Sequence, residues 1–220
     1  MARGADAGSD HQLAFVNALT SSVLAERHTT ILRALLDGDI DGQQLSGLAV
    51  DTDLRWRLVV ALAAAGAIDS DGEDTPFIDD EASRDNTAAG ARMAAAARAS
   101  RPQLAVKESV RKRVVEDDSV PNTTARAIIG AFSEPGQGDL LDSFVDRYFD
   151  DIEEVWKRRS SEVAQTVVIG LYPSWSVTDD SVAKADTFLE RDLPPALRRL
   201  VIEGRAGVVR ALAAREADAQ

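Results

Sequence analysis

The sequence has no cysteine, few aromatic residues and few histidines, and each shortage excludes a class of protein. Without cysteine, neither a disulfide framework, a thiolate nucleophile nor a cysteine-ligated zinc site can form. Aromatic residues make up 5% of the 220 residues, whereas apolar residues make up 45%, with alanine and leucine dominant. This composition favours closely packed helices over a β-sandwich or barrel, because those folds need more β-branched and aromatic residues.

Positive charge is also in short supply. The chain has 25 Lys and Arg residues against 37 Asp and Glu residues, which gives a formal net charge of -12. This balance argues against nucleic acid as a partner, because phosphate binding depends on Lys and Arg. No apolar run approaches the ~20 residues that span a bilayer, and the opening MARGADAGSDHQ lacks the apolar core of a secretory signal. We therefore expect a cytoplasmic protein that binds neither nucleic acid nor a membrane.

Proline and glycine divide the chain into segments with helical periodicity, and no convincing pair of strands is found. Residues 26–37 have one apolar face, whereas residues 53–65 are apolar on nearly all sides, as in a helix buried between two layers. Residues 138–157 oppose an apolar stripe to a row of carboxylates, and residues 196–212 also gather their apolar side chains. About ten such helices with short loops predict an all-α fold of antiparallel helical hairpins. No internal boundary is evident, so a single domain is predicted over residues 1–220.

Three helix starts are predicted from capping residues. Thr178 is placed to cap the helix that follows it, and Asn86 is placed to cap the alanine-rich segment 88–99. Ser119 resembles a cap with Pro121 in the first helical turn.

The search for catalytic chemistry returns mostly negatives. His11 and His28 fall in different predicted helices without a metal-ligand spacing, and no H-E-x-x-H pair is present. A catalytic triad would also need an oriented carboxylate and a serine on a sharp turn, which nothing marks. The acidic segment 69–81 has carboxylates at the first, third and fifth places of a calcium loop, but Asp74 stands where the loop needs glycine. We predict a solvated linker there, and no catalytic or metal-binding residue in the chain.

A basic group on one predicted helix is the candidate for substrate binding. Lys107, Arg111 and Lys112 lie close together in the sequence among acidic neighbours. Two interpretations stay open: a solvated helix face, or an anion site in a groove that holds a carboxylate. A second basic run, residues 157–159, ends a strongly acidic helix, where cations complement the C-terminus of that helix.

Five stretches of the sequence resemble, in the same order, the C-terminal helical domain of bacterial aminopeptidase N enzymes, especially those of the actinobacterial type. They are VDTDLRWRLVVALAAAGAID, RDNTAAGARMAAAARASRP, SVPNTTARAIIGAF, SSEVAQTVVIGLYPSWSV and LPPALRRLVIEGRAGVVRALAAREADA. Each stretch alone is weakly specific, because helices rich in Ala and Arg are common, whereas five in order are fairly specific. The likeness extends from about Asp10 to Ala219.

The resemblance implies a function that this chain cannot perform alone. Members of the family are zinc metallopeptidases, or gluzincins, that remove single residues from peptide N-termini. They hold zinc with H-E-x-x-H and a later Glu, and they bind the free amine through a Gly-x-Met-Glu-Asn type motif. Neither motif occurs here, so no catalytic or metal residue is carried over, and zinc is expected in the parent enzyme.

The C-terminal domain of the family is an α-superhelical bowl of HEAT/armadillo-like hairpins that caps the active site and limits peptide access. The expected partners are the catalytic domain of the same polypeptide and peptide substrates. The chain is then a fragment, with some apolar surface exposed where the catalytic domain docks.

Two alternatives stay open. A stand-alone helical-repeat scaffold would bind protein partners on a concave face. An enzyme that uses paired carboxylates is disfavoured, because an acid–base pair needs one carboxylate in an apolar pocket, and the carboxylates here lie on polar faces.

Overall fold

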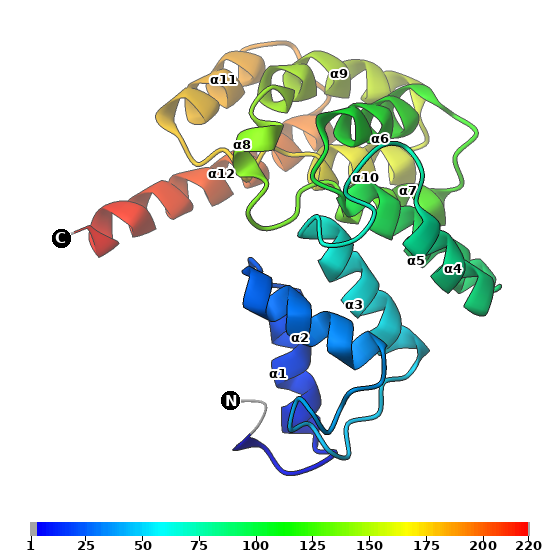
Figure 1. Ribbon diagram of the computed structural model, residues 1–220. Coiled ribbons are helices and arrows are strands. Elements are labelled where there is room, and N and C mark those ends of the chain that lie inside the picture. Colours follow the sequence, from blue (N-terminus) through cyan, green and yellow to red (C-terminus); the bar gives the residue numbers. More distant parts are fainter. Residues whose placement is uncertain (1–3, 220) are drawn as a thin grey trace. The chain divides into compact units, whose positions relative to one another are not determined.

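The computed structural model describes residues 4–219, and this part of the chain consists of helices and loops without a strand (Figure 1). The predicted all-α fold is confirmed. The helices are α1 (Asp10–Thr20), α2 (Glu26–Leu36), α3 (Thr52–Ala64), α4 (Pro76–Arg84), α5 (Ala88–Ser100), α6 (Leu104–Glu116), α7 (Asn122–Gly130), α8 (Gly138–Leu141), α9 (Phe144–Arg158), α10 (Ser161–Gly170), α11 (Asp179–Leu189) and α12 (Pro195–Asp218).

The chain divides into two compact units. The first comprises Met1–Val106 with Glu134–Gly136, and the second comprises Lys107–Ser133 with Gln137–Gln220. The division falls inside α6, where the sequence has neither glycine nor proline to mark it. The single domain predicted over residues 1–220 stays a prediction.

Helix α3 is the centre of the first unit. It packs most extensively against α5 and also contacts α1 and α2, while α4 packs against α5. Leu58, Val59 and Leu62 are completely buried, which confirms the prediction of a helix covered on nearly all sides. The small side chains of α5 permit this close approach, and the hydroxyl of Ser100 lies within 3.3 Å of the carbonyl oxygen of Val60.

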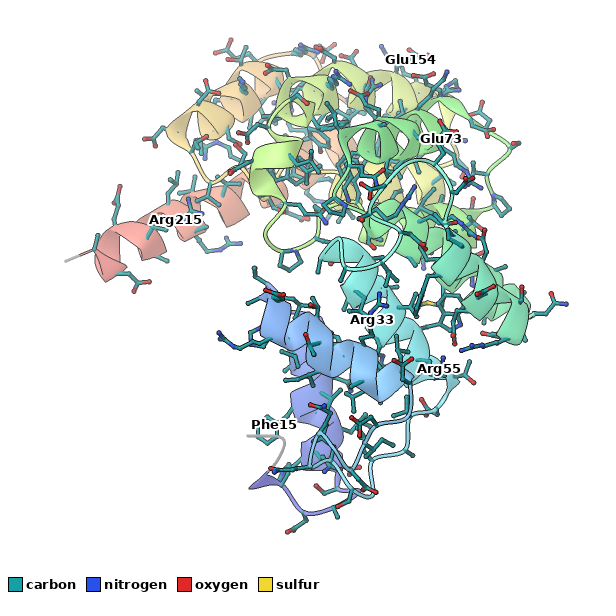
Figure 2. The ribbon with its side chains drawn as sticks, viewed as in Figure 1. Phe15, Arg33, Arg55, Glu73, Glu154 and Arg215 are labelled. Carbon is teal, nitrogen blue, oxygen red and sulfur yellow. The ribbon has the colours of Figure 1, made fainter. Side chains whose placement is uncertain are left out.

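Polar side chains fasten α3 to its neighbours. Arg55, labelled in Figure 2, donates to the carboxylate of Glu81 on α4 and to the carbonyl oxygen of Leu36 at the end of α2. The indole N–H of Trp56 donates to the carboxylate of Asp85, over 2.8 Å. These bonds join α3 to α4 and to the end of α2.

The second unit shows how the helices stack. The consecutive pairs α9·α10 and α11·α12 are in contact, and so are the helices two apart, α9·α11 and α10·α12. Stacking of each helical pair on the next is the arrangement of helical-hairpin repeats. The predicted pairwise packing of helices is therefore confirmed, and the superhelical bowl stays a prediction.

Aromatic side chains are concentrated in the core of this second unit. Tyr148 and Phe149 of α9 lie edge to face, with ring centroids 5.0 Å apart, and Tyr172 lies 5.4 Å from Tyr148. Phe188 of α11 extends the cluster at 5.6 Å from Phe149. The hydroxyl of Tyr148 donates to the carbonyl oxygen of Val168, which satisfies the buried phenol.

Two helices differ from their predicted bounds. Residues 138–157 form two helices rather than one, because a turn at residues 142–143 separates α8 from α9. Asp142 and Ser143 keep right-handed backbone angles, so the apolar pattern passes through the turn unchanged and does not reveal it. Helix α12 extends beyond the predicted residues 196–212 at both ends. No helix in the described range is both long enough and apolar enough to cross a membrane.

Of the three capping residues predicted from the sequence, one is correct and two are wrong. The hydroxyl of Thr178 accepts a hydrogen bond from the backbone N–H three residues later, as predicted. Thr87 rather than Asn86 caps α5, because its hydroxyl accepts the corresponding N–H at 3.0 Å. Helix α7 starts two residues later than predicted, with Pro121 rather than Ser119 at the N-cap. Ser119 instead donates to the carboxylate two residues before it.

Candidate functional site

The three basic candidates on α6 lie in different surroundings. Lys107 is completely buried, with its ammonium 5.8 Å from the ring centroid of Phe132. Arg111, one turn later, donates through Nε and Nη2 to the carboxylate of Asp151 on α9, at 2.7 and 2.5 Å. Lys112 is exposed. The structure therefore does not gather the three into one exposed patch, and their role in binding a carboxylate stays a prediction.

The partner of Arg111 limits what this arginine can bind. The pKa of Asp151 is raised, chiefly by burial, although the guanidinium of Arg111 opposes this shift. A carboxylate held away from water depends on its bidentate arginine. A peptide carboxylate would have to compete with Asp151 for Arg111, whereas Lys112 faces solvent.

The second basic run lies at the end of α9, as predicted, and one of its arginines also contacts the end of α6. Lys157 lies in the last turn of α9 and pairs with Glu153. Arg159 donates to the carbonyl oxygens of Val114 and Asp117, at 2.8 and 2.7 Å, at the end of α6. The last four carbonyl groups of a helix have no partner within that helix. Arg159 therefore caps the end of α6 while Lys157 serves the last turn of α9, and the charge of the run is explained without a ligand.

The solvated linker predicted over residues 69–81 is correct for residues 70–74, which form an exposed loop, and wrong from Pro76 onward, where α4 begins. The carboxylate of Asp69 accepts hydrogen bonds from the backbone N–H groups of Phe77 and Ile78, at 3.1 and 3.0 Å. Asp69 thus caps the first turn of α4 from the preceding loop. Among the described residues, no group of three or more His, Cys, Asp or Glu side chains is placed to hold a metal ion.

Both histidines lie in the first unit, on different helices. His11 is exposed on α1. The Nδ1 atom of His28 accepts a hydrogen bond from the backbone N–H of Ala25, at 3.1 Å, and so caps the start of α2. His28 is therefore a helix-end residue.

A groove between α7 and α10 was missed by sequence reasoning. It has a volume of about 590 Å³, and the ion pair of Arg126 and Glu162 crosses its rim at 3.3 Å. Ile169 stands in the groove with 60% of its side chain exposed. At Gly170, a Cβ atom would overlap the side chain of Ile129, so the close approach of α7 and α10 depends on glycine. In the sequence, Gly170 near the end of an apolar helix was the only sign of this close approach between two helices.

A second groove, of about 450 Å³, lies between α9 and α11. The ammonium of Lys184 bridges the carboxylates of Asp146 and Asp180, at 2.8 and 2.9 Å. Arg191 lies over the ring of Phe188, 4.8 Å from its centroid. Both grooves are open and edged with charge, so they suit contact with an extended polar chain better than enclosure of a small molecule.

Comparison with known proteins decides the family. The sequence profile of the ERAP1-like C-terminal domain matches residues 2–210. The chain belongs to the ERAP1-like C-terminal domain family. Its sequence is 45% identical over 218 residues to aminopeptidase N of Streptomyces lividans, an alignment that covers 99% of this chain and 24% of that protein. This ERAP1-like C-terminal domain thus spans about a quarter of the length of that relative, and its resemblance to aminopeptidase N is confirmed.

The matched range contains every candidate surface described above. In this ERAP1-like C-terminal domain, the basic residues of α6 and both grooves fall within residues 2–210. The family match therefore concerns the same helices that carry the grooves.

Proposed function

We propose that this ERAP1-like C-terminal domain is part of a cytoplasmic zinc aminopeptidase, in which it caps the active site and gates the access of peptides. The observation that carries the proposal is the alignment of 99% of the chain with aminopeptidase N, at 45% identity. The bond-breaking groups and the zinc would lie in another domain of the same polypeptide, because H-E-x-x-H is absent from this sequence.

The residues of this chain do not fit a zinc site. Zinc in proteins takes three or four Cys, His or carboxylate ligands at close range. The chain has no cysteine, and the described residues hold no suitable cluster. We therefore assign no step of the reaction to the residues of this domain.

The proposed contribution is positioning and access. Contacts far from the reacting bond change kcat only if they position the substrate or close the site around it. A long peptide would reach the grooves of this domain, whereas a single-residue amide reporter would not. The domain should consequently affect how the rate depends on peptide length.

Two measurements test this function. The isolated chain, with or without added zinc, should not release an aminoacyl reporter. In the aminopeptidase polypeptide, removal of this domain should change the dependence of kcat/KM on peptide length while the single-residue reporter is still hydrolysed. An unchanged length dependence, with the reporter still hydrolysed, would contradict gating.

The reading frame of the gene distinguishes the aminopeptidase proposal from the alternative of a stand-alone helical scaffold. If the proposal is right, the reading frame continues upstream into an H-E-x-x-H motif. A reading frame without it would favour a stand-alone helical scaffold.

A further inference from the structure

Three aspartates of the first unit are followed directly by glycine, at Asp37–Gly38, Asp41–Gly42 and Asp71–Gly72. At such a step, the backbone nitrogen of the glycine can attack the side-chain carboxyl group of the aspartate, because glycine has no Cβ atom to obstruct the approach. All six residues are exposed, so exposure does not distinguish the three steps. The hydrogen bonds of the glycine N–H groups do.

Two of the three glycine N–H groups are held. Gly38 donates to the carbonyl oxygen of Leu35 over 3.2 Å, and Gly42 donates to the carboxylate of Asp39 over 2.9 Å. Among the described residues, none accepts a hydrogen bond from the N–H of Gly72. A nitrogen that donates a hydrogen bond must release it before it can attack, and a typical bond reduces the fraction that is free about fivefold.

The carboxylate of Asp71 is also weakly held. Asp71 lies in the exposed loop 70–74, which carries Glu73, labelled in Figure 2. In the described part of the chain, its one hydrogen-bond contact is the hydroxyl of Ser70 at 3.5 Å, which is longer than a usual O–H···O hydrogen bond. The neighbouring carboxylate of Asp69 is instead bound by two backbone N–H groups of α4. Asp71 therefore combines a loosely held side chain with a free N–H on the following residue.

We propose that Asp71–Gly72 is a site of spontaneous covalent modification, at which Asp71 becomes isoaspartate through a succinimide. The nitrogen of Gly72 forms a bond to the side-chain carboxyl carbon of Asp71, and a hydroxyl group of that carboxyl group leaves with the amide proton as water. Hydrolysis of the ring at the backbone carbonyl carbon adds one water and leaves the chain linked through the side-chain carboxyl group. No oxidant or reductant takes part. This inference is independent of the proposed function.

The surroundings of the step give the modification a structural consequence. Arg101 is only 4% exposed, and its Nη1 donates to the carbonyl oxygens of Asp69 and Gly72, at 3.0 and 3.2 Å. Its Nε has no acceptor among the described residues. The two carbonyl groups lie on either side of Asp71, and isoaspartate lengthens the backbone between them by one atom. The loop must then shift, and a buried guanidinium that loses an acceptor is destabilising.

The first arm of the test compares the three steps within one protein. The 220-residue chain is stored at neutral pH and body temperature for weeks, and peptide mapping with fragmentation that distinguishes isoaspartate from aspartate follows each step. Isoaspartate should accumulate at least about fivefold faster at residue 71 than at residues 37 and 41, because only the glycine after residue 71 has a free N–H. Equal rates at the three steps, or no isoaspartate at residue 71, would overturn the proposal.

The same measurement in concentrated urea separates structure from local sequence. In the unfolded chain no N–H group is held by the fold, so the three rates should converge. If residue 71 keeps its full advantage in urea, local sequence rather than the structure sets its rate, and the proposal fails.

The second arm measures the effect on stability. Asp71→Glu keeps the charge, but its longer side chain would have to close a larger and less favourable ring; Asp41→Glu is the matched control at another exposed step. Fresh samples of both variants and of the wild type should melt alike. After storage, the wild type and Asp41→Glu should contain an isoaspartyl fraction that melts about 2–4 °C lower, and Asp71→Glu should not. A stored Asp71→Glu that declines as the wild type does, or an isoaspartyl fraction that melts with the fresh protein, would contradict the inference.

Discussion

The ring of Tyr172 lies against Gly204 of α12, where a Cβ atom would stand 2.5 Å from the ring atom Cδ2. Tyr172 lies two residues after the end of α10, and its burial raises the pKa of the phenol to about 12. Glycine at this position therefore lets the chain after α10 approach the backbone of α12. The contact of α10 with α12 depends on a missing side chain.

We predict opposite effects of alanine at the two glycines of α12. Gly204→Ala should lower the free energy of unfolding by about 1–3 kcal/mol, because overpacking forces the ring of Tyr172 to move. Gly207→Ala should raise it by about 0.5–1 kcal/mol, since alanine is the better helix former and the nearest atom is 3.9 Å away. Urea unfolding followed by circular dichroism measures both. A Gly204→Ala variant as stable as Gly207→Ala would contradict the close contact.

The bidentate pair of Arg55 and Glu81 gives a second prediction. Both nitrogen–oxygen distances are 2.7 Å, and the Glu81 side chain is only 4% exposed. Glu81→Gln should lower the free energy of unfolding by about 3 kcal/mol, because loss of one partner leaves the other charge poorly solvated. The matched control is Asp80→Asn on the same helix, at an exposed position, where urea unfolding should show little change. Equal effects of the two substitutions would refute the structural role of the pair.

The same pair predicts how stability depends on pH. The hydrogen bond from Arg55 is the main cause that lowers the pKa of Glu81 from its usual 4.5. The unfolded chain then binds a proton at a higher pH than the folded chain does. The advantage of the wild type over Glu81→Gln should be complete above about pH 4.5 and should be lost as the pH falls through the folded-state pKa of Glu81. Urea midpoints of both proteins between about pH 7 and pH 3 test this, and a pH-independent difference would count against it.

The cap that Arg159 provides at the end of α6 gives a further prediction about stability. Arg159→Met should lower the free energy of unfolding by about 1–2 kcal/mol, because it deprives two carbonyl groups near the end of α6 of their donor. Hydrogen exchange should accelerate first in the last turn of α6. The control Lys157→Met changes an exposed residue of the same run that pairs within its own helix, so its unfolding midpoint should stay near that of the wild type. If both variants behave alike, the cap contributes nothing.

Substitutions of Arg111 and Lys112 on α6 should have different effects, because Arg111 pairs with Asp151 and Lys112 is exposed. In the aminopeptidase polypeptide, Lys112→Ala removes an exposed charge. If Lys112 holds the carboxylate of a long peptide, kcat/KM should fall about tenfold for that peptide and little for the single-residue reporter. Arg111→Ala strands Asp151, so we expect lower stability and similar losses on both substrates. No loss for Lys112→Ala on either substrate would identify a solvated helix face, which is the outcome we expect for this residue.

The sequence by itself determined the features that depend on local order along the chain. Helical periodicity predicted the buried α3, and a single hydroxyl predicted the cap at Thr178, because both depend on residues within a few positions of one another. The five ordered stretches likewise predicted the family that the profile match then established.

Only the tertiary structure decided where the basic side chains bind. Arg111 and Asp151 are 40 positions apart, and Arg159 is 45 positions from Val114, yet in each case a short distance between two helices makes them partners. The local sequence of a run of basic residues does not indicate whether the run faces solvent or the end of another helix. The groove between α7 and α10 and the groove between α9 and α11 are also not apparent from the local sequence, since exposure is set by which helix faces are left uncovered.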